Sequence, residues 1–271
     1  MKIRIIAAVA LLPLLLLVVL FAPKICTAIL FGLLSAIGAY ELLIGTKIVK
    51  NLRLCLYSAV MGFWCVLWCG LGIHYAWLLL SALLFWIALF AEMMASDMRL
   101  SFEKTAVCLC AGVFLPMLLG SIVRIHGMEH GRYFVLIPFA LAFLSDTGAY
   151  FAGLRFGKRK LAATISPKKT VEGVIGGVVA AVAGMALYCA VLDLACGFEV
   201  NYLYSIAYGT IGSAAGVFGD LCFSVVKRQT GIKDYGNLIP GHGGVLDRFD
   251  SMMLVGPLAE VLLLLLPMAV K

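Results

Sequence analysis

The sequence predicts an all-α polytopic membrane protein of about nine transmembrane helices, with a cytoplasmic N-terminus and an extracytoplasmic C-terminus. Its 271 residues are 63% hydrophobic and only 13% charged, whereas soluble domains carry about 25% charged residues. The mean hydropathy is +1.08, and so little polar surface cannot cover a water-soluble globule. The composition therefore excludes a soluble enzyme, a disordered chain and a fibrous protein.

Uninterrupted apolar runs set the expected spans, because a helix needs roughly 20 apolar residues to cross the hydrocarbon core. Lys2 and Arg4 precede a leucine-rich first run, as in a signal peptide, but no small-residue cleavage site follows, which favours a retained anchor. We expect residues 1–132 to form a scaffold of about five spans and residues 133–271 to form a catalytic transmembrane region. The expected spans are 3–22, 25–44, 54–72, 75–94, 105–123, 133–152, 171–192, 202–226 and 251–270.

The charges in the loops set the expected orientation. With the N-terminus in the cytoplasm, 17 of the 21 Lys and Arg residues lie on the inner side. An excess of positive charge is typical of cytoplasmic loops. The formal net charge of +7 is then a cytoplasmic feature, and we expect a multi-pass protein of the cell membrane whose active site faces the cytoplasm.

Asp146 is the first polar residue that demands an explanation. It lies about two turns from the inner end of the sixth expected span. An ionisable residue inside a span costs roughly 2.5–3.5 kcal/mol on insertion scales, so it is a functional candidate by default. The alternative is an aspartate that pairs with a lysine and joins two helices.

The segment from Ser166 to Glu172 predicts a helix start, with Ser166 as the N-cap and Pro167 at the first helical position. Lys168 and Lys169 would then lie in the first turn, where the helix dipole disfavours cations. A phosphate bound at this helix end would resolve the conflict. A basic loop at the membrane surface remains the alternative.

Glycines in the eighth expected span recur at intervals of three, four and three residues, which places them on one helical face. Such a stripe predicts close helix packing. The same face continues towards the inner surface through a carboxylate, a hydroxyl and an ammonium group, an arrangement typical of a site. The glycines are Gly209, Gly212, Gly216 and Gly219, and the polar residues are Asp220, Ser224 and Lys227.

The last inner loop combines glycines, carboxylates and basic residues. Glycines let backbone amides approach phosphate oxygens, and Mg²⁺ prefers one or two carboxylates together with substrate phosphates. Neither a P-loop nor a dinucleotide-binding GxGxxG fingerprint is present. The loop therefore predicts phosphate and metal chemistry on a membrane scaffold, on the side where nucleotides are found.

These residues resemble the signature of the phosphatidate cytidylyltransferases, also called CDP-diacylglycerol synthases. The match spans 27 residues without a departure, and the segments 145–150 and 166–173 are similar to the family too. The matching signature reads Ser224-x-Val226-Lys227-Arg228-x4-Lys233-Asp234-x-Gly236-x2-Ile239-Pro240-x-His242-Gly243-Gly244-Val245-x-Asp247-Arg248-Phe249-Asp250.

The resemblance implies that CTP and phosphatidate react to give CDP-diacylglycerol and pyrophosphate, and we expect in-line attack of a phosphatidate oxygen on the α-phosphorus of CTP. It implies Mg²⁺ held by Asp220 and Asp247, with Asp146 as a third candidate ligand and K⁺ as a candidate second ion. The expected catalytic residues are Asp220, Asp247, Lys227, Arg228 and His242. The expected substrate-binding residues are Ser166, Lys168, Lys169, Ser224, Lys233, Gly243, Gly244 and Arg248.

Other functions share part of this pattern. A transporter predicts polar residues near the bilayer midplane in symmetric halves, whereas here they cluster at one face of one half. A CDP-alcohol phosphatidyltransferase needs a DGxxAR-type motif, which the sequence lacks. A CTP-dependent polyisoprenoid kinase stays open as the closer alternative. The expected partners are CTP, phosphatidate and membrane lipid, with a homodimer as one candidate assembly and no nucleic acid.

Overall fold

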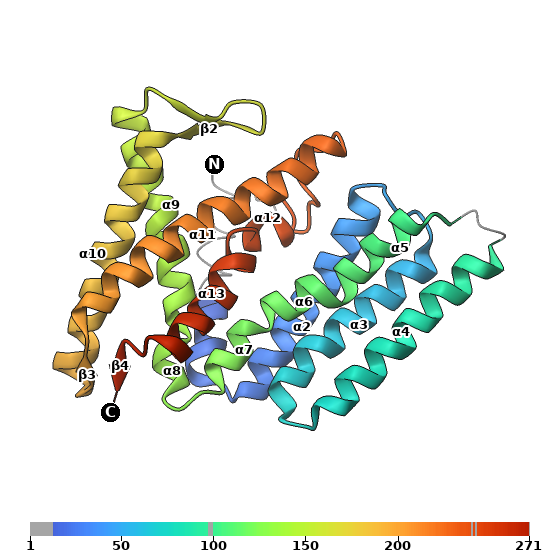
Figure 1. Ribbon diagram of the computed structural model, residues 1–271, viewed down its shortest axis with the longest axis horizontal. Coiled ribbons are helices and arrows are strands. Elements are labelled where there is room, and N and C mark those ends of the chain that lie inside the picture. Colours follow the sequence, from blue (N-terminus) through green and yellow to red (C-terminus); the bar gives the residue numbers. More distant parts are fainter. Residues whose placement is uncertain (1–12, 97–99, 240, 242, 271) are drawn as a thin grey trace. The chain divides into compact units, whose positions relative to one another are not determined.

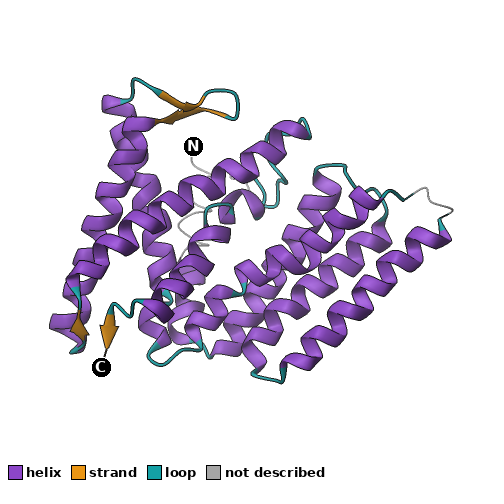
Figure 2. Cartoon of the chain, in the orientation of Figure 1, coloured by secondary structure: helices purple, strands orange, loops and turns teal. Residues whose placement is uncertain are grey.

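The computed structural model describes residues 13–96, 100–239, 241 and 243–270. These residues are mainly helical, and their strands form two short antiparallel pairs (Figure 2). They make two compact units. Unit 1 holds the described residues of Met1–Tyr133 and Lys227–Phe249, and unit 2 holds those of Phe134–Val226 and Asp250–Lys271. One boundary between the units falls after Tyr133, and the signature loop belongs to the unit that holds the first half of the chain.

Unit 1 is a helical bundle in which α2 packs along α3 (Figure 1). Small residues permit this approach: a Cβ on Gly32 of α2 would lie 2.9 Å from the ring of Phe63 on α3. Asn51 caps α3 by accepting the backbone N–H of Arg53 at 3.0 Å. The elements are α2 (Lys24–Tyr40), the π-helical turn η1 (Glu41–Gly45), α3 (Leu52–Leu71), α4 (Tyr75–Ala95), α5 (Phe102–Leu109), η2 (Cys110–Phe114), α6 (Leu115–Leu119), α7 (Ser121–His126) and α12 (Leu246–Phe249).

Unit 2 is built on α9 and α10, which lie side by side (Figure 1). Their contact is close because Gly148 of α9 faces the Cβ of Ala180, and Gly176 of α10 faces the Cβ of Ala152. The strand pair β1–β2 precedes α10, whereas β3, which pairs with β4 near the C-terminus, follows it. The elements are α9 (Leu136–Phe156), β1 (Lys160–Ala162), β2 (Ser166–Thr170), α10 (Val171–Cys196), β3 (Glu199–Val200), α13 (Met252–Leu265) and β4 (Ala269–Val270).

Two further helices cross the unit boundary along the chain, namely α8 (Gly131–Phe134) and α11 (Tyr202–Gln229). Together, the described residues contain seven helical segments that are long and apolar enough to cross a membrane. This agrees with a polytopic all-α membrane protein. The seven segments are Lys24–Gly45, Leu52–Leu71, Tyr75–Ala95, Phe102–His126, Gly131–Phe156, Val171–Cys196 and Tyr202–Gln229.

The first and last expected spans differ from these seven. Residues 13–21 are helical, but the first part of the span expected over 3–22 lies outside the described residues. The last span was expected over 251–270, yet α13 ends at Leu265 after 14 residues. The helix stops there because the next residue, Leu266, precedes a proline and is disfavoured in helical conformation. At 1.5 Å per residue α13 is about 21 Å long, which is less than the hydrocarbon thickness.

The expected helix start at Ser166 is wrong. Residues Ser166–Thr170 form strand β2, and α10 begins at Val171 with Thr170 as its N-cap. The Thr170 hydroxyl accepts the N–H of Gly173 at 3.1 Å, and Glu172 supplies the acidic first turn that the helix dipole favours. Lys168 and Lys169 therefore lie in strand β2, before the helix begins. They are not in the first turn of α10, so the helix dipole does not disfavour them there.

The glycine stripe on α11 packs closely, as expected, but not uniformly. A Cβ on Gly209 would lie 2.5 Å from the Cα of Val182, and one on Gly219 would lie 2.8 Å from the carbonyl oxygen of Asp250. A Cβ on Gly216 would meet its nearest neighbour at 3.4 Å, an ordinary contact. The close approach of backbones is thus required at Gly209 and not at Gly216.

This difference predicts unequal effects of alanine. Gly209→Ala should lower the free energy of unfolding by about 1–3 kcal/mol, because the new methyl group meets backbone that cannot move aside. Gly216→Ala should leave it nearly unchanged. Thermal unfolding of the two variants in detergent measures the difference, and equal midpoints would contradict the packing account.

Candidate active site

The buried pair Lys227–Asp247 is the centre of the signature loop in unit 1. Lys227 Nζ lies 2.8 Å from Asp247 Oδ1, and the two side chains are only 12% and 2% exposed. Asp247 Oδ2 accepts the backbone N–H groups of Tyr235 at 2.8 Å and Gly244 at 3.0 Å. Lys227 Nζ also lies 5.4 Å from the ring centroid of Tyr235. Three donors therefore fix the Asp247 carboxylate, and they tie together α11, the loop and α12.

Gly243 is required by the turn that wraps this carboxylate. Its φ of +87° suits glycine, and a Cβ there would lie 2.9 Å from Asp247 Oδ2. The carbonyl of Gly243 accepts the N–H of Ile239 at 3.0 Å and closes the turn. Gly243 and Gly244, the glycines predicted to bind phosphate, face the carboxylates of Asp247 and Glu41, respectively.

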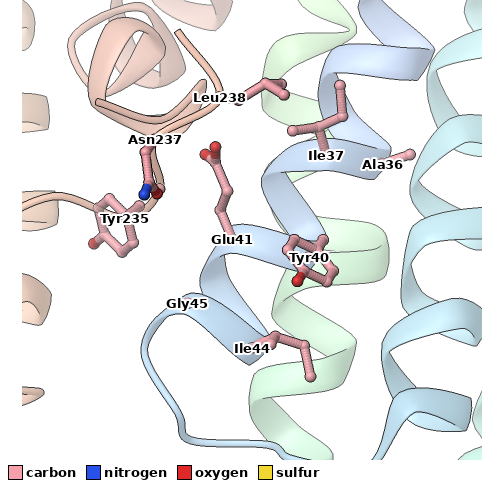
Figure 3. A pocket seen from close by; sticks show the side chains of 10 residues that line it. Ala36, Ile37, Tyr40, Glu41, Ile44, Gly45, Tyr235, Asn237 and Leu238 are labelled. Atoms are coloured by element: carbon pink, nitrogen blue, oxygen red, sulfur yellow. The ribbon is translucent and has the colours of Figure 1, made fainter. Parts of the chain in front are cut away.

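Glu41 is a residue of the site that the sequence analysis missed. It lies at the start of η1, is 3% exposed, and accepts the N–H groups of Val245 and Leu246 at 2.9 Å each. Figure 3 shows its side chain projecting towards the loop that carries Tyr235 and Asn237. These residues line a cavity of about 590 Å³. The available signal was the one that singled out Asp146, an acidic residue in an apolar run, but the first half was interpreted as scaffold.

A second cluster, in unit 2, centres on Asp220. Lys169 Nζ lies 2.6 Å from Asp220 Oδ2, and the Ser224 hydroxyl donates to Oδ1 at 3.1 Å. Lys169 also donates to the carbonyl of Val217 at 3.4 Å. The side chains of Lys169 and Asp220 are 21% and 28% exposed. The spacing of Asp220 and Ser224 thus predicted a real contact, and β2 adds an ammonium group to it.

A cavity of about 470 Å³ opens in unit 2 beside this cluster. Its lining gathers three lysines and one aspartate from β1, β2 and α9, together with apolar residues of α9, α10 and α11. Glu172 holds the chain that leads into β1, because it accepts the N–H groups of Lys158 and Arg159. The charged lining residues are Asp146, Lys160, Lys168 and Lys169.

Of the other predicted residues that the structure describes, one is half-buried and three are exposed. Ser166 is half-buried in β2, where it pairs with Ala162. His242 lies outside the described residues. Three basic residues of the signature expose their side chains: Arg228, Lys233 and Arg248.

The donor chemistry of the two aspartates bears on the expected Mg²⁺. Within the described part of the chain, no three His, Cys, Asp or Glu side chains gather in one place. A carboxylate offers about four lone-pair sites. Donors among the described residues take two of these sites on Asp220, which is partly exposed, and three on Asp247, which is buried. Both retain acceptor capacity and so fit a cation, Asp220 more readily than Asp247.

The fold and the clusters define a class: a polytopic helical membrane protein with lysine–carboxylate pairs held by a glycine-rich loop and a basic strand pair. The chain belongs to the cytidylyltransferase family, whose family model matches residues 2–266. It is similar to the phosphatidate cytidylyltransferases of Staphylococcus aureus (strain COL; 39% identical over 174 residues), Staphylococcus haemolyticus (38% over 169) and Staphylococcus epidermidis (37% over 169). Each match covers 62% of this chain and 63% of the relative, so it spans less than two thirds of these relatives.

Proposed function

We propose that the protein transfers the cytidylyl group of CTP to phosphatidate and so forms CDP-diacylglycerol and pyrophosphate in phospholipid biosynthesis. The observation that carries the proposal is the buried Lys227–Asp247 pair within an unbroken family signature. Membership of the cytidylyltransferase family supports it, and the named relatives carry the same activity in their names.

The chemistry suits the charges of the two clusters. A phosphate monoester is already largely anionic at neutral pH, so phosphatidate needs no strong general base to attack the α-phosphorus of CTP. Lysines that neutralise the equatorial oxygens and the leaving pyrophosphate stabilise the transition state. Lys168 and Lys169 line a cavity that also exposes apolar residues to a lipid substrate. Two further basic residues would add to this charge stabilisation: Lys227, which is paired with Asp247, and Arg228, which is exposed.

Mg²⁺ belongs to the proposal as a cofactor. Asp220 and Asp247 would hold it, with Asp146 as a further ligand, and K⁺ stays a candidate second ion. The ion would supply Lewis-acid polarisation of the α-phosphoryl group. The chain's own contribution is to orient both carboxylates, through Ser224 and Lys169 for Asp220 and through the Tyr235 and Gly244 amides for Asp247.

We also propose that the protein lies in the cell membrane with its N-terminus and its active site in the cytoplasm. The contacts of Glu41 support this, because they join the expected inner end of α2 to the expected inner loop after α11. The pairing of β3 with β4 sets the C-terminal residues at the end of α10 opposite to β2. A reporter inserted between β1 and β2 should read as cytoplasmic and one fused to the C-terminus as extracytoplasmic; the reverse pattern would contradict the orientation.

An assay of the purified protein tests the proposed activity. Given CTP, Mg²⁺ and dioleoyl phosphatidate in detergent, it should form CDP-diacylglycerol, which mass spectrometry identifies directly. Diacylglycerol in place of phosphatidate should give no product, because it lacks the attacking phosphate. Absence of product with phosphatidate, or phosphorylation of a polyisoprenol supplied in place of phosphatidate, would contradict the proposal.

A further inference from the structure

Glu41 is a buried carboxylate that the proposed chemistry does not use. It comes from η1, at the end of α2, and lies more than 200 residues before the backbone it binds. Oε1 accepts the N–H of Val245 and Oε2 accepts that of Leu246, each at 2.9 Å. Because each oxygen has its own donor, the contact needs two acceptors and fits a carboxylate.

The signature loop is shaped around this carboxylate. A Cβ on Gly244 would lie 2.5 Å from Glu41 Oε1, and one on Gly236 would lie 2.6 Å from the same atom. On the other side of the contact, Gly45 of η1 faces the carbonyl oxygen of Tyr235, where a side chain would collide. Neither Gly236 nor Gly244 adopts a positive φ. These two glycines therefore make room for Glu41, and backbone conformation does not demand them.

Two carboxylates divide three consecutive amides of this turn between them. Asp247 accepts the N–H of Gly244, and Glu41 accepts those of Val245 and Leu246. Asp247 therefore binds the turn that leads into α12, the helix that contains Asp247 itself. Glu41 binds the same turn from η1, which is distant in the sequence but belongs to the same unit. Without Glu41, two buried amides lose their partners, and the turn that orients Asp247 towards Lys227 loses its outside support.

We infer that Glu41 is a positioning residue for cytidylyl transfer: it holds the signature loop in the conformation in which Asp247 and Lys227 are paired. The inference rests on the proposed function for its catalytic meaning. It also assigns the first half of the chain a part in the site, because α2 and η1 supply an anchor of the loop and not only a scaffold around it.

Three substitutions test this role. Glu41→Gln keeps the shape but turns an amide donor towards one of the two N–H groups, and should lower kcat by about tenfold or more. Glu41→Asp keeps both acceptors on a shorter side chain and should recover part of the loss. Glu92→Gln is the matched control, because Glu92 is a carboxylate of α4 that contacts Tyr57 and Arg53 away from the loop.

Hydrogen exchange supplies a readout that does not depend on activity. In Glu41→Gln the amides of Val245 and Leu246 should exchange about tenfold faster, as expected for local opening, while peptides of α3 and α4 and the thermal midpoint stay unchanged. If the unmodified protein makes no product from CTP and phosphatidate, the proposed function fails, and the exchange of these two amides still tests whether Glu41 orders the loop.

A double substitution tests the contact itself. Gly244→Ala should lower activity in the presence of Glu41, because the new Cβ meets its carboxylate. Added to Glu41→Ala, the same change should cost little more, since the space is then empty; such non-additivity marks residues in direct contact. Activity of Glu41→Gln within twofold of the unmodified protein, or an equal loss in Glu41→Gln and Glu41→Asp that follows a lowered thermal midpoint, would overturn the inference.

Discussion

Asp247→Asn is expected to lower the rate of CDP-diacylglycerol formation by at least about two orders of magnitude, which corresponds to about 2.7 kcal/mol. The substitution leaves Lys227 as a buried charge without its partner, and breaking such a pair costs about 3–5 kcal/mol. It also sets an amide donor against either Lys227 or the N–H groups of Tyr235 and Gly244. The initial rate at saturating CTP and phosphatidate measures the effect.

Two further variants separate chemistry from folding. Lys227→Met combined with Asp247→Asn removes the unpaired charge, so it should regain thermal stability without regaining activity. Asp193→Asn changes a half-buried aspartate of α10 whose carboxylate accepts the Tyr202 hydroxyl at 2.9 Å, and it should keep full activity. Near-normal turnover of Asp247→Asn would mean that the reaction does not depend on this carboxylate.

Asp220→Asn is also expected to lower activity by at least about two orders of magnitude, because Asp220 is the partly exposed carboxylate best able to hold a cation. The alternative is that Asp220 binds no cation and serves only to orient the Lys169 ammonium group. Lys169→Met should then cost as much as Asp220→Asn, and the double variant should cost no more. We expect a smaller loss for Lys169→Met, of about tenfold, which is the scale of one charge-assisted hydrogen bond. Equal losses in all three variants would leave Asp220 with the orienting role alone.

The helical spacing of residues in the eighth expected span predicted which of their side chains share one face of α11. Steps of four residues placed Ser224 beside Asp220, and the structure has the hydrogen bond between them. Gly209, Gly212 and Gly219 of the same face pack closely, as their spacing predicted, whereas Gly216 makes only an ordinary contact. These features could be predicted because they depend on the geometry of one helix, and α11 is continuous over 28 residues.

Features set by contacts between distant segments could not be predicted in this way. Ser166–Pro167 carries a helix-start signal, but pairing with β1 holds it as a strand, and Thr170 takes the N-cap four residues later. Glu41 gave only the signal of a carboxylate in an apolar run, and its partners lie in the last loop. Local sequence cannot name such partners, because strand pairing and buried hydrogen bonds depend on tertiary context.

The position of the phosphorus atom that enters the lipid tests the proposed reaction most directly. In cytidylyl transfer the α-phosphorus of CTP enters the lipid and pyrophosphate leaves, whereas in a CTP-dependent lipid kinase the γ-phosphorus enters and CDP leaves. Membranes that contain this protein, given phosphatidate and Mg²⁺, should form organic-extractable label from α-labelled CTP and none from γ-labelled CTP. Omission of phosphatidate or chelation of Mg²⁺ should abolish the label, and added pyrophosphate should reverse its formation. Label from the γ position would contradict cytidylyl transfer and favour the kinase.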